Sequence, residues 1–127
     1  MHRFEVFKDM YAVCRLNRIP EGLAWQGDFL CLCKAGQEIS LVCRENQLPL
    51  VEIELTELGW RVMRLIGEFA FSELGILAKI SDILAKAKIS IFVISTYNTD
   101  FIMLKDDCLE QAIKVLSSAG YIFEVSQ

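Results

Sequence analysis

The stretch SIFVISTYNTDFIML, residues 90–104, contains two apolar, strand-like runs that are separated by polar side chains. The polar part lies between Ser95 and Phe101 and offers hydroxyls, an amide and the carboxylate of Asp100 at one strand end. Such a cluster suits a small zwitterion, because a carboxylate binds an ammonium group while hydroxyls and backbone amides bind a carboxylate. The same residue types also favour turns through local hydrogen bonds, so a polar hairpin turn is the alternative interpretation.

The second half of the chain has a regular pattern of elements around this stretch. Apolar residues recur at spacings of three and four over residues 74–87, which predicts an amphipathic helix. The full expected set is a strand at 61–67, this helix, strands at 89–96 and 101–105, a helix at 107–119 stopped by Gly120, and a strand at 121–125. This βαββαβ order predicts an α+β fold of the ferredoxin-like type, a sandwich of one antiparallel sheet against two helices.

The first half of the chain has a reduced version of the same plan. We expect a strand at 10–16, about two helical turns at 20–26, a hairpin at 29–43 and a strand at 51–55. A second helix is missing, and residues 56–59 form a connector that is too short for a free linker. The pattern therefore predicts two modules packed side by side, a reduced one at 1–59 and a complete one at 60–127.

The five cysteines show no CxxC spacing, so neither a disulfide framework nor a zinc site is predicted. A hairpin turn at residues 35–37 would pair Cys33 with Ile39 and Cys31 with Leu41. All four side chains would then lie on one core face, where the cysteines act as small hydrophobic residues. We expect structural thiols, no metal and no cofactor.

Composition and charge exclude several classes of function. The chain has 127 residues and a net charge of -4 with no basic run, so nucleic acid is not expected as a partner. The longest apolar runs are far shorter than the roughly 20 residues needed to cross a bilayer, and residues 1–8 do not read as a signal peptide. A cytoplasmic location is expected. One histidine and no phosphate-binding loop argue against an enzyme.

The second half resembles the ACT domain, the small-ligand sensing module of amino-acid metabolism. The resemblance rests on GEFAFSELGILAKISDIL, residues 67–84, on ISIFVISTYNTDFIML, residues 89–104, and on the βαββαβ order around them. The whole chain is similar to short bacterial proteins with two tandem ACT modules, which are related to the regulatory regions of aspartate kinases and to animal cytosolic arginine sensors. The first half matches only in outline, and its missing second helix departs from the family pattern.

This resemblance implies that two modules join their sheets and hold an amino acid at their shared interface. The positions that match the family's ligand contacts are Ser72, Glu73, Leu74, Gly75 and Ile76 at the helix start, and Ser95, Thr96, Asn98, Thr99 and Asp100 on the strand side. Backbone N–H groups at a helix start attract a carboxylate, and a glycine there lets a ligand approach closely. Glu73 or Asp100 would take the ammonium group. The duller alternative is that Ser72 and Glu73 only cap the helix.

Two functions follow from these observations. The first is non-enzymatic binding of a small amino acid or similar metabolite, which requires the helix start and the polar strand end to converge on one hollow. The alternative is a protein interaction module, such as a homodimer contact, with no ligand. Exposed edge strands are ready pairing surfaces, and a chain with 54% hydrophobic residues buries more area by dimerising.

Overall fold

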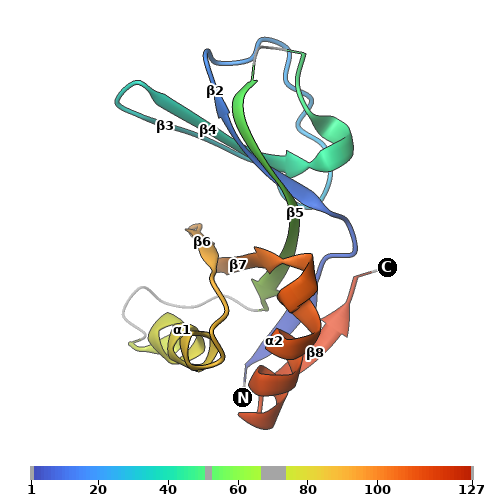
Figure 1. Cartoon of the computed structure of the whole chain (residues 1–127), viewed down its shortest axis with the longest axis vertical. Helices are drawn as coiled ribbons and strands as arrows, with labels where there is room; N and C mark the ends of the chain where they lie inside the picture. Colours follow the sequence, from blue (N-terminus) through green and yellow to red (C-terminus); the bar gives the residue numbers. More distant parts are fainter. Residues whose placement is uncertain (1, 51–52, 67–73, 127) are drawn as a thin grey trace. The chain divides into compact units, whose positions relative to one another are not determined.

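A computed structural model of the chain describes residues 2–50, 53–66 and 74–126. The chain forms two compact units. Unit 1 consists of Met1–Lys8 and Arg61–Gln127, and unit 2 consists of Asp9–Trp60. The long strand β5, Ile53–Leu65, belongs to unit 2 in its first part and to unit 1 in its last part (Figure 1).

Two strands, at 51–55 and 61–67, and a connector at 56–59 were expected, and this expectation is wrong because β5 is one continuous strand. Residues 56–59 stay in the strand because β5 pairs with β2, Tyr11–Leu16, at Thr56, Glu57 and Trp60. The pairing register shifts between Tyr11 and Val13, and Gly59 has a φ of 82°. A β-bulge with a glycine in the left-handed region thus absorbs the irregularity that looked like a break.

Unit 1 has the expected α+β architecture of a ferredoxin-like fold. Its elements are β1 (Arg3–Val6), the end of β5, α1 (Ile76–Lys86), β6 (Phe92–Ser95), β7 (Asp100–Lys105), α2 (Asp106–Ser118) and β8 (Ile122–Val125). Both helices contribute to one core with the strands, through Ile80 and Leu84 of α1 and Ala112 and Leu116 of α2. The two helices therefore bury their apolar stripes against the same face of the sheet.

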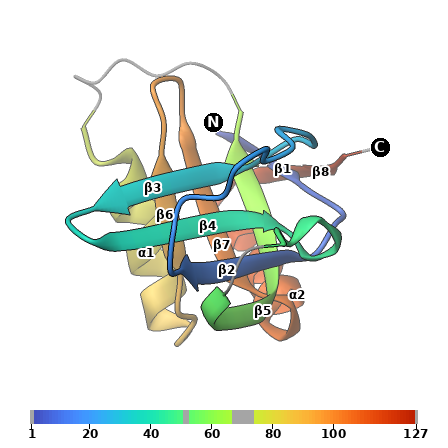
Figure 2. The ribbon, with the colours of Figure 1, turned by 90° about the horizontal axis from the view of Figure 1, so that it is seen from above.

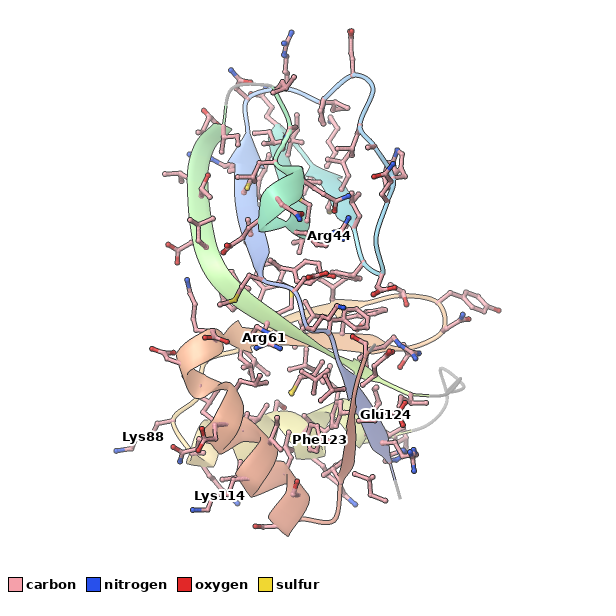
Figure 3. The ribbon with its side chains drawn as sticks, turned by 90° about the vertical axis from the view of Figure 1, so that its right-hand side faces the viewer. Arg44, Arg61, Lys88, Lys114, Phe123 and Glu124 are labelled. Carbon is pink, nitrogen blue, oxygen red and sulfur yellow. The ribbon has the colours of Figure 1, made fainter. Side chains whose placement is uncertain are left out.

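The strand β1 is an element that the sequence analysis did not predict. It pairs antiparallel with β5 and parallel with β8, so it lies between the first and last strands of the βαββαβ set. Phe4 is fully buried, and its ring stacks at a centroid distance of 5.1 Å on Phe123 of β8, which is labelled in Figure 3. On the other face Arg3 forms an ion pair of 2.8 Å with Glu124. Alternation of buried and exposed residues thus fixes the face of β1.

Unit 2 is built on a sheet in the order β3-β4-β2-β5 (Figure 2). The strand β3 spans Cys31–Ala35, β4 spans Glu38–Arg44, and a single 3-10 turn, η1, spans Glu45–Gln47. Residues 9–50 and 53–60 contain no α-helix, so the helix expected at 20–26 is wrong. Gly22 has a φ of 65°, and so short a segment gains too few hydrogen bonds to offset nucleation of a helix.

The hairpin of β3 and β4 has a register one residue away from the expected one. Its turn is Gly36 and Gln37, so that Cys33 pairs with Ser40 and Cys31 with Val42. Gly36 has a φ of 60°, which permits a two-residue loop in place of the expected three. A slip of one residue exchanges the two faces of a strand, and Cys33 is accordingly exposed. The expectation that Cys31 and Cys33 lie on the core face is wrong.

The buried ring of Phe4 predicts that β1 is required for the stability of unit 1. Phe4→Ala should lower the free energy of unfolding by about 3–5 kcal/mol, because it leaves a cavity between β5 and β8. Tyr97→Ala, at a ring that is 82% exposed in the same unit, is the control and should change stability by less than about 0.5 kcal/mol. Urea unfolding followed by circular dichroism measures both. Equal effects of the two substitutions would contradict the placement of β1.

A second prediction concerns alkaline pH. Burial, with Asp28 and Asp9 nearby, raises the pKa of Tyr11 to about 12. The unfolded chain releases this proton at a lower pH, so stability is full below pH 10 and falls as the pH rises towards 12. Tyr11→Phe should remove about 1 kcal/mol of that loss at pH 11. Urea unfolding of the wild type and of Tyr11→Phe at pH 9 and pH 11 tests this prediction. An equal loss of stability in the two proteins between these pH values would refute it.

Candidate functional site

Several element ends meet at one end of unit 1. The Ile66 amide donates to the Arg3 carbonyl at 2.9 Å, and the Ile122 amide donates to the His2 carbonyl at 3.2 Å. The Thr99 hydroxyl donates to the Leu65 carbonyl at 2.6 Å. The starts of β1, β7 and β8 therefore lie beside the end of β5. The helix α1 begins after β5 and α2 ends just before β8, so both polar segments that the sequence analysis selected belong to this end of the unit.

A cavity of about 560 Å³ lies at this end, which is the size of a small-molecule site. Its described lining comes from α1 and the two residues before it, the segment after α2 and the residue before β1. The lining residues are His2, Leu74, Gly75, Ile76, Lys79, Asp82, Ile83, Ala119, Gly120 and Tyr121. Three of them, Leu74, Gly75 and Ile76, were predicted as ligand contacts from the sequence.

The start of α1 presents open backbone to the cavity. Gly75 is the N-cap residue with a φ of 79°, and no side chain among the described residues caps the helix there. A Cβ built on Gly75 would meet no atom of the described residues, its chain neighbours aside, within 4 Å, so these residues leave a ligand room to approach the backbone. The first turn of α1 carries no acidic residue, whereas that of α2 carries Asp106 and Asp107. The positive end of the α1 dipole is therefore not offset by its own first turn.

The polar hairpin between β6 and β7 holds its side chains in local hydrogen bonds. The Ser95 hydroxyl donates to the Asp100 carboxylate at 2.5 Å, and these two residues are cross-strand partners. Both the amide and the hydroxyl of Thr96 donate to the Thr99 carbonyl, at 2.8 and 3.1 Å. Asn98 is exposed in the turn. These are the bonds that the turn interpretation expects.

The structure thus divides the ten predicted contacts into three sets. The first set, Leu74, Gly75 and Ile76, lines the cavity. The second set is Ser95, Thr96, Asn98, Thr99 and Asp100, and none of these belongs to the described lining. The third set, Ser72 and Glu73, lies outside the described residues.

The charged and aromatic part of the cavity was not predicted from the sequence. Lys79 and Asp82 were not selected, because periodicity shows which positions are polar and not what lies beside them. The carboxylate of Asp82 forms an ion pair of 3.0 Å with Lys86. The rings of His2 and Tyr121 stack at 6.4 Å with 23° between their planes. Burial raises the pKa of Tyr121, which further favours the protonated, uncharged form of its phenol group.

No group of three or more His, Cys, Asp or Glu side chains in residues 2–50, 53–66 and 74–126 is placed to hold a metal ion. Over the same residues, no helix has the length and the apolar character required to cross a membrane.

Comparison with known proteins identifies the family. The ACT domain family model matches residues 55–118, half of the chain, so the chain belongs to the ACT domain family. The human protein named cytosolic arginine sensor for mTORC1 subunit 1 is 41% identical over 58 residues. That match covers 45% of this chain and 18% of the human protein, so the chain spans a small part of this relative. The resemblance drawn from residues 67–84 and 89–104 is confirmed.

Solved structures confirm the fold. The crystal structure of a protein from Agobacterium tumefaciens has a TM-score of 0.88 at 26% identity, covering 99% of this chain and 94% of that one. The ligand-free regulatory subunit of aspartate kinase from Thermus thermophilus has a TM-score of 0.67 at 12% identity, covering 94% and 97%. At 12% identity the second likeness concerns the fold alone.

The hydrogen bond of Thr99 generates a prediction about the hairpin. Thr99→Val keeps the shape of the side chain and removes the donor to Leu65, so it should lower the free energy of unfolding by about 1–3 kcal/mol. The control is Asn98→Ala, at an exposed side chain of the same turn, which should change stability by less than about 0.5 kcal/mol. Urea unfolding of the two variants measures both effects. An unchanged stability of Thr99→Val would exclude a structural role for the Thr99 hydroxyl.

Proposed function

We propose that this chain is a non-enzymatic regulatory protein that binds a free amino acid or a similar small metabolite. Membership of the ACT domain family supports the regulatory class. The human relative is named as an arginine sensor, and the Thermus thermophilus neighbour is the regulatory subunit of aspartate kinase. Amino acids are therefore the first ligands to consider for this chain.

The single observation that carries the proposal is the cavity at the start of α1. Its volume of about 560 Å³ suits a ligand of amino-acid size, and its apolar and aromatic walls suit the carbon part of such a ligand. The backbone at the start of α1, which Gly75 leaves open, and the nearby Lys79 favour a carboxylate. The predicted contacts at Ser72, Glu73 and Asp100 stay predictions, and Asp100 lies outside the described lining of this cavity.

A homodimer contact is the second candidate function, and the edge strand β8 favours it. Among the described strands, β8 pairs only with β1, so its other edge is open for pairing. Ile122 is 44% exposed and Val125 is 65% exposed on this strand. An open edge that carries exposed apolar residues is a pairing surface for a second copy.

A thermal-shift screen with the twenty proteinogenic amino acids separates the two functions. A ligand at 100 times its dissociation constant should stabilise the fold by about 2.7 kcal/mol, which raises the melting temperature by roughly 10 °C. Sedimentation without ligand reports the oligomeric state. A dimer whose melting temperature no amino acid changes would contradict the sensor function and support the dimer contact.

A further inference from the structure

The cavity carries opposite charges on neighbouring turns of one helix. Lys79 and Asp82 are three residues apart on α1 and both line the cavity. Residues at this spacing lie on one helix face with Cβ atoms about 5–6 Å apart. The ammonium and carboxylate of an α-amino acid sit on one carbon atom, so a cation and an anion at this separation match both of its charged groups.

Lys79 has no ion pair with any residue that the structure describes, although it lies close to the start of α1. A cation near the positive end of a helix dipole is unfavourable, and a carboxylate bound beside Lys79 would offset both positive charges. Asp82 is held by Lys86, but its side chain is 61% exposed and has further oxygen lone pairs to offer. Among the described residues, the ammonium of Lys79 thus has no ion-pair partner, and the carboxylate of Asp82 can still accept a further hydrogen bond.

The remaining walls of the cavity are apolar or aromatic. The side chains of Ile76 and Ile83 come from α1, and the stacked rings of His2 and Tyr121 come from the residues before β1 and β8. A wall of this kind covers the carbon part of a ligand while the polar groups fix its orientation. The charges and the aromatic rings are contributed by different elements, so they meet only in the folded unit.

We propose that this cavity is the amino-acid site, in which Lys79 binds the α-carboxylate, Asp82 binds the α-ammonium group, and His2 and Tyr121 cover the ligand's side chain. The assignment rests on the proposed function and names contacts that lie outside the ten predicted from the sequence.

The test combines changes in the ligand with changes in the protein. The probe is the amino acid that gives the largest thermal shift, together with its methyl ester and its N-acetyl derivative, measured by calorimetric titration. On the wild-type chain each derivative should bind about tenfold more weakly than the parent, because each loses one charge-assisted contact. Lys79→Gln should abolish the penalty of the methyl ester, and Asp82→Asn should abolish the penalty of the N-acetyl group.

The matched control is Lys114→Gln on α2, a residue outside the described lining of the cavity (Figure 3). It should leave all three affinities unchanged. Melting curves without ligand check that each variant folds, since exposed substitutions of this kind cost little. If an amino acid binds the wild type, and the methyl ester and the N-acetyl derivative lose as much affinity in Lys79→Gln and Asp82→Asn as in the wild type, the cavity assignment is overturned while the proposed function stands. If no amino acid binds the wild type, the proposed function itself fails.

Discussion

The insertion of β1 between β5 and β8 is the constraint on which unit 1 depends. The last strand of the module has no other partner among the described strands, so residues from the start of the chain complete a fold built by its second half. Phe4 places a fully buried ring between the two neighbouring strands, where burial of a large aromatic side chain contributes several kcal/mol. The ion pair of Arg3 with Glu124 is half exposed and adds little by comparison.

The same strand connects the fold to the cavity. His2 precedes β1 and lines the cavity, and its carbonyl accepts the amide of Ile122 at the start of β8. A ligand held against His2 and Tyr121 would therefore stabilise the pairing of β1 with β8. The chain leaves unit 1 directly after β1 and returns to it within β5, so both connections to unit 2 begin or end at paired strands of unit 1.

Elements with long periodic patterns could be predicted from the sequence, and elements fixed by single residues could not. Both helices lie within two residues of their expected bounds, because their apolar stripes are strong. The four residues of β1 are too few for a reliable period. The register of the β3–β4 hairpin differs by one residue from the expected one, because Gly36 permits a tighter turn. The bulge at Gly59 was mistaken for a connector between two strands.

The candidate site was predictable only at the start of α1. Leu74, Gly75 and Ile76 could be selected because they match positions of ligand contact in the family that the chain resembles. Lys79 and Asp82 lie in the same motif but match no such position, and by periodicity they are ordinary polar residues of a helix. Their proximity to Tyr121 depends on α2 ending beside the start of α1. Such a meeting of distant segments is a property of the packed unit and leaves no local signal.

Native-state hydrogen exchange of the β1 and β8 amides, with and without a stabilising amino acid, tests the central claim most directly. The account predicts that the amides of the two strands exchange through one cooperative opening and that both are slowed together when the amino acid is added. Exchange of β1 that is fast, independent of β8 and unchanged by the amino acid would contradict it.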